Sequence, residues 1–205
     1  MNEFERWQGR FAASDYVFGT QPNAFLKSQA PLLRAGARAL AVADGEGRNG
    51  VWLAEQGLVV TAVDFSPNGQ AKAHKLAAER GVSIETQLSD LADWEWPEST
   101  FDVVAAIFIQ FCAPPVREKI FAGIRRTLKS AGLLLMQGYR PEQLAYKTGG
   151  PSQIENLYTS ELLRRYFGDW EIVQLKEHDS AISEGSGHGG MSALIDLVAR
   201  KPSVG

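Results

Sequence analysis

Short apolar runs alternate along the chain with longer segments of helical periodicity. The apolar runs cover residues 37–43, 58–63, 82–88, 101–108 and 133–139. Helices are predicted between them at residues 48–55, 67–80 and 114–129. Strand–helix–strand alternation of this kind predicts right-handed crossovers and a mostly parallel sheet with helices on both faces. The stretch at 103–109 is continuously apolar, as expected of a strand buried on both sides.

Two of the predicted helices have clear local signals. Ser66 can cap the segment at 67–80, Pro67 suits its first position and Gly81 suits its end. In the segment at 114–129, apolar residues recur at helical spacing and charged residues take the opposite side. Both segments are therefore predicted to pack one face on the sheet.

The C-terminal part departs from this alternation. A helix is predicted around 159–167, followed by strand-like runs at 170–176 and 192–199. The Gly/Ser-rich stretch at 183–190 between these runs is predicted to be a loop. With no helix to cross over, the two strands should pair antiparallel. The sequence thus predicts an α/β fold, a Rossmann-like three-layer sandwich with an antiparallel C-terminal hairpin.

Composition narrows the class of protein. The 205 residues suit one domain spanning 1–205, and 21 Lys and Arg against 24 Asp and Glu give a net charge of −3. Because the chain has no excess of positive charge to attract nucleic acid or an anionic membrane, neither is expected as a partner. The single Cys112 excludes an internal disulfide and a cysteine-based metal site, and no metal is expected. Lacking a signal peptide or an apolar run of about 20 residues, the chain is expected to be soluble and cytoplasmic.

A glycine-rich turn follows the first predicted strand. Residues 44–50 read D-G-E-G-R-N-G and contain G-x-G-x-x-G, and Asp64 ends the second strand 19 residues after Gly45. Nucleotide-dependent oxidoreductases use the same pattern. Asp44 and Glu46 add negative charge to the turn, with only Arg48 to oppose it, so the turn is a poor cradle for a diphosphate. A cationic ligand that carries an adenosine, such as S-adenosylmethionine, fits it better.

Acidic residues gather at one edge of the predicted sheet. Asp44, Glu46, Asp64 and Asp90 lie at the carboxyl ends of adjacent predicted strands, the edge where open α/β sheets bind ligands. Asp90 can accept a hydrogen bond from an adenine amine, and Ile107 offers an apolar wall. Other readings stay open, because Asp64 could cap the next helix and Asp90 could belong to a turn. Glu46 is expected to face solvent.

A resemblance that covers almost the whole chain rests on five stretches. They are residues 16–26 (YVFGTQPNAFL), 45–49 (GEGRN), 63–67 (VDFSP), 143–151 (QLAYKTGGP) and 198–202 (VARKP). These stretches resemble the class I S-adenosylmethionine-dependent methyltransferases, and more narrowly their small tellurite-resistance and thiopurine-type branch. The resemblance implies a seven-stranded sheet with one antiparallel strand. The chain departs from the family pattern at Ala41 and Ala43, where an acid and a glycine are usual, and the KSAG at 129–132 keeps only the turn glycine of the usual motif.

The same resemblance implies a cofactor site. Gly45 and Gly47 would pass close to the methionine moiety, Asp64 would hold the ribose hydroxyls, and Asp90 with Leu91 would hold the adenine. The candidate cofactor-binding residues are Asp44, Gly45, Gly47, Asp64, Phe65, Asp90, Leu91, Ile107, Tyr16 and Phe18.

The N-terminal segment, residues 1–30, is predicted to be a helix followed by a lid. Trp7 and Phe11 lie on one helical face, which either packs the helix onto the domain or covers the cofactor. Tyr16 and Phe18 are the better lid candidates, because their ring faces can contact a sulfonium. Arg10 could pair with the methionine carboxylate or remain solvated.

Methyl transfer from a sulfonium is an in-line displacement that needs alignment and desolvation. A soft nucleophile such as a thiol or a metalloid species needs no general base, so the expected function is transfer to a small-molecule acceptor of this kind. The weak catalytic candidates are Tyr139 and His188, and His188 could equally be an exposed loop residue. A non-catalytic module that binds S-adenosylmethionine or S-adenosylhomocysteine and an NAD(P)-dependent oxidoreductase remain the alternatives.

Overall fold

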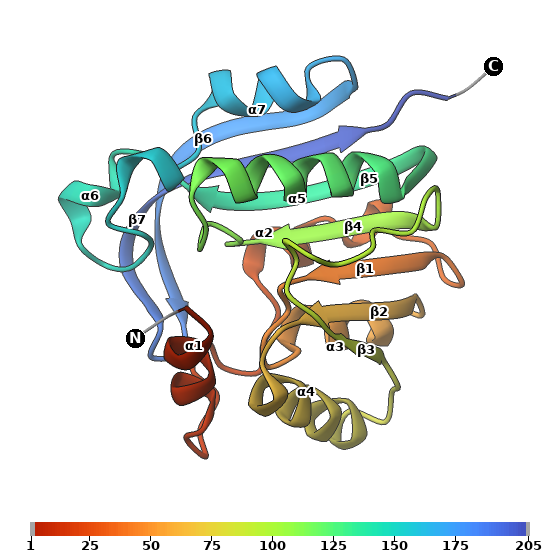
Figure 1. Ribbon diagram of the computed structural model, residues 1–205, viewed down its shortest axis with the longest axis vertical. Helices are drawn as coiled ribbons and strands as arrows, with labels where there is room; N and C mark the ends of the chain where they lie inside the picture. The colour runs from red at the N-terminus through yellow and green to blue at the C-terminus, as the bar shows by residue number, and fades with distance from the viewer. Residues whose placement is uncertain (1–2, 204–205) are drawn as a thin grey trace.

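The computed structural model describes residues 3–203 and contains a sheet of seven strands (Figure 1). Along the sheet the strands follow the order β3-β2-β1-β4-β5-β7-β6. They are β1 (Arg38–Val42), β2 (Val59–Asp64), β3 (Glu85–Leu88), β4 (Phe101–Ile107), β5 (Leu128–Tyr139), β6 (Glu171–Glu184) and β7 (His188–Arg200). Strands β1 to β5 pair in parallel, whereas β7 runs antiparallel to both β5 and β6. The predicted α/β sandwich with an antiparallel C-terminal hairpin is confirmed.

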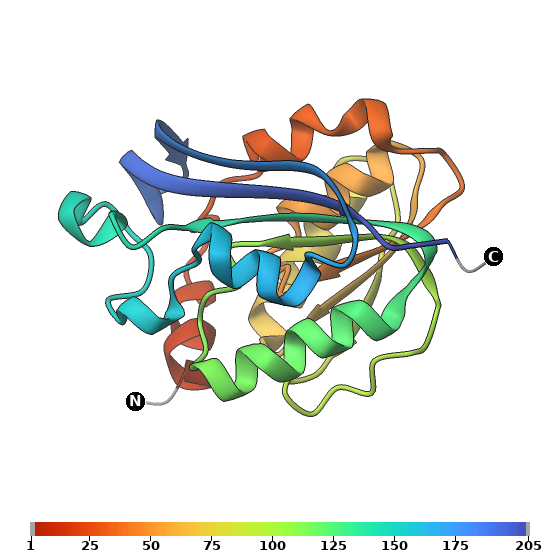
Figure 2. The same ribbon diagram turned by 90° about the horizontal axis from the view of Figure 1, so that it is seen from above.

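Helices cover both faces of the sheet, as Figure 2 shows from above. On one face α5 (Pro114–Thr127) and α7 (Ser160–Phe167) bury Phe121 and Phe167 against strand residues such as Val104. On the other face α2 (Ala24–Ser28), α3 (Arg48–Glu55) and α4 (Pro67–Glu79) pack against the alternate strand residues, among them Ala105. Strands buried from both sides explain why their sequences are continuously apolar.

Local signals in the sequence located α4 well and α5 less well. Ser66 caps α4 by accepting a hydrogen bond from Gly69 N, and Pro67 is its first residue, as predicted. The helix predicted over 114–129 ends instead at Thr127, because Leu128 already has an extended backbone and begins β5. The third strand is also shorter than predicted and begins at Glu85.

The C-terminal hairpin is much longer than the sequence predicted. The expected loop at 183–190 is wrong, because Glu184 pairs with His188 and only residues 185–187 form the turn. The tip of the hairpin reaches the N-terminal segment, where Gly187 N donates to Val17 O at 2.9 Å. A Cβ on Gly185 would lie 2.5 Å from Gly19 N, so this close approach requires glycine.

The N-terminal segment crosses the carboxyl ends of the parallel strands. Its first helix, α1 (Glu3–Phe11), lies between α4 and the tip of the hairpin (Figure 1). Shorter helical pieces are η1 (Ala30–Leu32), α6 (Gln143–Tyr146) and η2 (Ile154–Asn156). Within residues 3–203, none of the helices combines the length and the apolar content that crossing a bilayer requires.

Candidate functional site

The glycine turn connects β1 to α3 with a backbone that bends sharply. Ala43, Gly45 and Gly47 all have positive φ angles, of 50°, 55° and 89°. A Cβ on Gly47 would lie 2.5 Å from the Cβ of Ala73, so the absence of a side chain lets the turn pack directly on α4. The turn is therefore held at the carboxyl end of β1, next to the end of β2.

Asp64 fastens this turn to β2. Its Oδ2 accepts a hydrogen bond from Gly45 N at 2.9 Å and its Oδ1 accepts one from Ser66 N at 2.8 Å. The side chain is buried, and burial raises the pKa of Asp64 while the backbone donors oppose that rise. Because an ionised carboxylate has about four acceptor positions, each oxygen can still accept a hydrogen bond from a ligand.

Asp44 lies inside the bend of the turn. Both of its carboxylate oxygens accept from Gly50 N at 3.1 Å, which stabilises the first turn of α3. Burial raises the pKa of Asp44 to about 7, and the charge of Asp64 acts in the same direction. A cation bound beside Asp44 would offset both effects and favour the ionised form.

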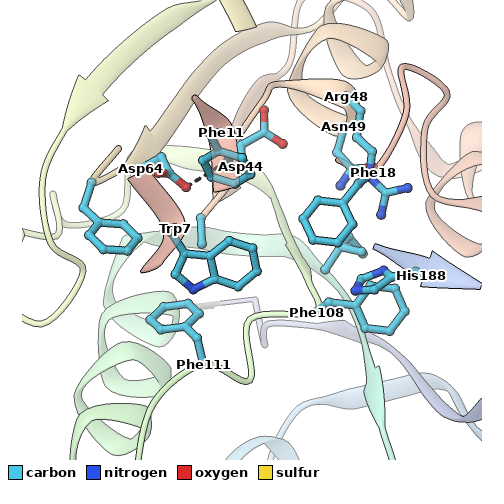
Figure 3. Close-up of a pocket in the computed structure, with 14 residues that line it drawn as sticks. Trp7, Phe11, Phe18, Asp44, Arg48, Asn49, Asp64, Phe108, Phe111 and His188 are labelled. Atoms are coloured by element: carbon cyan, nitrogen blue, oxygen red, sulfur yellow. Dashed lines mark hydrogen bonds between the residues drawn. The ribbon is translucent and has the colours of Figure 1, made fainter. Parts of the chain in front are cut away.

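Three connected hollows open beside this turn, at the carboxyl ends of the strands. We name them the central cavity (about 90 Å³), the adjacent pocket (about 300 Å³) and the polar pocket (about 350 Å³). The central cavity shares Asp64 and Phe65 with the adjacent pocket, and Phe108 and His188 with the polar pocket. Its lining comprises Trp7, Phe11, Phe18, Ala43, Asp44, Gly45, Arg48, Asn49, Asp64, Phe65, Ile107, Phe108, Phe111 and His188 (Figure 3).

Helix α1 covers the central cavity with aromatic side chains. The ring of Phe11 packs against Gly45, where a Cβ would lie 3.1 Å from the ring. In Figure 3 the indole of Trp7 stands between Asp64 on one side and Phe18 on the other. Trp7 and Phe11 thus line the central cavity, and their role as a lid over a cofactor stays a prediction.

Glu46 ties the segment after α1 to the glycine turn. Its expected exposure to solvent is wrong, since only 4% of the residue is exposed. Its carboxylate accepts from Val17 N at 2.8 Å and pairs with Lys72 Nζ at 2.7 Å. Tyr16 lies outside the three hollows and donates to the carbonyl of Lys72 instead.

A buried charged cluster joins the hairpin to α3. Arg48 Nη2 lies 2.7 Å from Glu184 Oε2, and His188 Nδ1 lies 3.4 Å from the same oxygen. Burial opposes ionisation of Glu184, but the hydrogen bond from His188 and the charge of Arg48 outweigh it and lower the pKa of Glu184 to about 2. Burial and the charge of Arg48 lower the pKa of His188, against the pull of Glu184.

This cluster fixes the state of His188. Since the Glu184 carboxylate is ionised and can only accept, Nδ1 of His188 carries the hydrogen and Nε2 of the neutral ring can take up a proton. The ring is enclosed by Phe18, Phe108 and Tyr139, at centroid distances of 4.5, 4.6 and 5.7 Å. His188 is therefore a buried residue at the junction of two hollows.

The structure brings most of the predicted site residues together. Those that line at least one hollow are Phe18, Asp44, Gly45, Asp64, Phe65, Asp90, Leu91, Ile107, Tyr139 and His188. Gly47 and Tyr16 line none of the three. Phe108, which the sequence places with Ile107 as an apolar wall at the end of the fourth strand, lines the central cavity, whereas sequence reasoning missed Asn49 in the glycine motif and Phe111 shortly after β4.

The sheet order, the glycine turn and the acid at the end of β2 define the class I methyltransferase fold. Residues 39–132 match a family model described as a methyltransferase domain. This match confirms the resemblance to the class I S-adenosylmethionine-dependent methyltransferases that the sequence indicates.

Individual relatives agree with this assignment. A phosphatidylethanolamine N-methyltransferase of Cereibacter sphaeroides is 29% identical over 126 residues, which are 60% of this chain and 61% of that protein. The chain thus matches about three-fifths of the length of this curated relative. The similarity to solved structures establishes the fold and nothing further, because the sequence identities to them are below 25%.

Three solved structures illustrate that fold. One, from work on conversion of a disulfide bond into a thioacetal group during echinomycin biosynthesis, has a TM-score of 0.78 at 17% identity and covers 98% of this chain and 92% of its own. NodS of Bradyrhizobium japonicum WM9 in complex with S-adenosyl-L-homocysteine has a TM-score of 0.71 at 13% identity, covering 99% and 100%. TehB of Haemophilus influenzae has a TM-score of 0.70 at 16% identity, covering 97% and 66%.

Proposed function

We propose that this protein is an S-adenosylmethionine-dependent methyltransferase that acts on a small-molecule acceptor, and that residues 1–205 form one domain with 1–30 as its lid. The observation that carries the proposal is the row of three connected hollows across the carboxyl ends of the strands. The central cavity has an acidic turn, the adjacent pocket is mostly apolar, and the polar pocket contains a buried histidine. The cytoplasmic location expected from the sequence stays a prediction.

The residues present fit the adenosine part of this cofactor. The free acceptor positions of Asp64 suit the two ribose hydroxyls, and Phe65 lies beside it in both hollows. In the adjacent pocket Asp90 and the buried Leu91 suit an adenine, which presents an exocyclic amine and an apolar face. The volume of about 300 Å³ lies within the usual range for ligand pockets, roughly 300–1,000 Å³.

The central cavity fits the methionine part, because it offers one negative and one positive side chain to the two charged groups of an amino acid. Asp44, which lines the cavity, suits the ammonium group. Arg48 suits the carboxylate, because its buried Nη1 has no hydrogen-bond partner among residues 3–203 while Nη2 is held by Glu184. At about 90 Å³ the cavity is below the usual range for ligand pockets, so Trp7 and α1 are expected to shift when the cofactor enters.

The reaction needs little chemistry from the protein beyond alignment, exclusion of water and removal of a proton. When bound, the cofactor supplies a methyl group on a positively charged sulfur. A bond forms between the acceptor's nucleophile and the methyl carbon as the carbon–sulfur bond breaks, and the sulfur keeps the electron pair in S-adenosylhomocysteine. His188 Nε2 accepts the proton of the nucleophile, and Glu184 holds the ring and stabilises its charged form. Phe18 and Phe108 keep water from this junction.

Titration with cofactors tests the proposal directly. S-adenosylmethionine and S-adenosylhomocysteine should each raise the melting temperature, because they bind the folded state, whereas NAD and NADP should leave it unchanged. Turnover is then measured as S-adenosylhomocysteine formed with thiols, phenols, amines, selenite and tellurite. A shift with NAD alone would overturn the cofactor assignment, and binding without turnover on any of these acceptors would favour the non-catalytic module.

The raised pKa of Asp44 predicts that cofactor affinity depends on pH. If the ionised carboxylate is the form that binds the ammonium, a pKa of about 7 makes binding about tenfold weaker at pH 6 than at pH 8. The folding stability of the ligand-free protein depends on pH in the opposite direction. The folded state holds a proton that the unfolded state has lost above its pKa of 3.8, so stability falls as pH rises from there toward 7.

Titration calorimetry with S-adenosylhomocysteine at several pH values checks the change in affinity, and unfolding of the ligand-free protein over the same pH values checks the change in stability. Asp44→Asn should bind more weakly than the wild type at pH 8 and should lose most of the pH dependence. An unchanged slope in Asp44→Asn would assign the dependence to another group of the central cavity, Asp64 or His188.

A further inference from the structure

The polar pocket lies next to the central cavity and extends it away from Asp64. It shares Trp7, Phe108, Phe111 and His188 with that cavity. A molecule in the polar pocket can therefore place one atom beside His188 and leave the rest of its body between the lid and the loop at 149–153. Its volume of about 350 Å³ suits a small organic molecule.

Charge in the polar pocket is unbalanced toward the positive. Its charged lining residues are Glu3, Arg6 and Arg10. Glu3 already pairs with Arg6 at 3.2 Å and accepts a second hydrogen bond from Trp7 Nε1 at 3.1 Å. Between residues 3 and 203, no carboxylate lies within ion-pair distance of Arg10. Its guanidinium lies over two rings instead, 4.7 Å from the centroid of Trp7 and 5.4 Å from that of Phe18.

Arg10 is not needed for the cofactor carboxylate. Arg48 borders the central cavity and has a buried nitrogen without a partner, whereas Arg10 lines only the polar pocket. The two arginines are therefore placed for two different anions. A guanidinium that is half-buried against aromatic rings is also pre-organised for a planar carboxylate.

The rest of the wall suits a flat, partly polar molecule. Four aromatic side chains line the pocket, namely Trp7, Phe108, Phe111 and Tyr139. Two lining residues have a buried oxygen without a hydrogen-bond partner among residues 3–203, the side-chain amide of Asn156 and the hydroxyl of Tyr139. Unpaired buried polar atoms are uncommon in proteins, so these two favour a bound molecule that supplies the missing hydrogen bond.

We propose that the methyl acceptor is a small aromatic acid, whose anionic group pairs with Arg10 and whose nucleophile lies beside Nε2 of His188. This inference rests on the proposed function, because it identifies the polar pocket as the acceptor site. The inference specifies that the acceptor is anionic and planar, and the methylated atom can be sulfur, oxygen or nitrogen.

The test compares acids with their neutral amides on protein loaded with S-adenosylhomocysteine. The probes are 4-mercaptobenzoate, 4-hydroxybenzoate and 4-aminobenzoate, each paired with the corresponding benzamide and titrated by calorimetry. At least one acid should bind about tenfold more tightly than its amide, equivalent to about 1.4 kcal/mol. Arg10→Gln should remove this preference and leave the affinity for S-adenosylhomocysteine within twofold. Arg164→Gln is the matched control and should keep the preference, since Arg164 is exposed on α7 and lines none of the three hollows.

Each contrary result has a distinct meaning. Equal binding of acids and amides, no binding of any of the six probes, or a preference that survives in Arg10→Gln would overturn the inference. A large loss of S-adenosylhomocysteine affinity in Arg10→Gln would also overturn it and would assign Arg10 to the cofactor carboxylate. If wild-type protein fails to bind S-adenosylhomocysteine at all, the proposed function itself is wrong.

Discussion

Replacing Asp64 by alanine is expected to weaken binding of S-adenosylhomocysteine at least about a hundredfold. The change removes the hydrogen bonds proposed for the ribose hydroxyls, and bonds to a charged group contribute about 1.5–3 kcal/mol each. It also releases Gly45 N and Ser66 N, which Asp64 holds at 2.9 and 2.8 Å, so the glycine turn loses its attachment to β2. Calorimetric titration of the variant measures the loss.

Two further variants separate binding from folding. Asp64→Asn keeps the shape of the side chain and can accept from only one of Gly45 N and Ser66 N, so it should disturb the turn less than alanine and still bind at least about tenfold more weakly, with thermal unfolding as the check on folding. Asp93→Ala removes an exposed carboxylate outside the three hollows and should leave the affinity unchanged. Wild-type affinity in a folded Asp64→Asn protein would show that the ribose role of Asp64 is wrong.

Replacing His188 by glutamine is expected to lower kcat about 10²- to 10⁴-fold for an acceptor that must lose a proton, which is the usual contribution of a general base. Because the pKa of His188 is lowered, the acid limb of the rate profile of the wild type should lie below pH 6.5, measured with saturating cofactor. The affinity for S-adenosylhomocysteine should change little, since His188 is proposed to act on the acceptor.

The matched control for this experiment is His74→Gln. His74 is exposed on α4 and interacts only with Thr86 in the part of the chain that the structure describes, so its loss should leave kcat unchanged. If His188→Gln methylates thiols and phenols at the wild-type rate, His188 does not act as a base.

Much of the fold could be predicted because its signals are local. Ser66 and Pro67 define the start of α4 through one backbone hydrogen bond and one fixed dihedral angle, and both are visible in the sequence. The long hairpin could not be predicted in this way. Gly189 and Gly190 carry no side chain to show a strand pattern, and their strand conformation comes from pairing with Ser183 and Ile182.

The site residues also divide into those with a local signal in the sequence and those whose contacts form only in the folded chain. Asp44, Asp64 and Asp90 could be located because each lies at the carboxyl end of a predicted strand, and the carboxyl ends of parallel strands meet at one edge. The burial of Glu46 could not be predicted, because it depends on Lys72 and on the backbone of Val17, which approach only in the folded chain. The pairing of Glu184 with both Arg48 and His188 likewise depends on the curl of the hairpin toward α3.

The turn at 185–187 separates Glu184, which pairs with the ring of His188, from His188 itself, which lines two of the three hollows. The nucleoside side of the cleft draws on β1, β2 and the segment after β3, none of which contacts this turn in the sheet order. Substitutions in the part of the hairpin that lines the polar pocket would therefore change the chemistry offered to the second substrate, while the nucleoside contacts stay with the first three strands. Proteins built on this plan can diversify what they modify through a few residues at the far end of the chain.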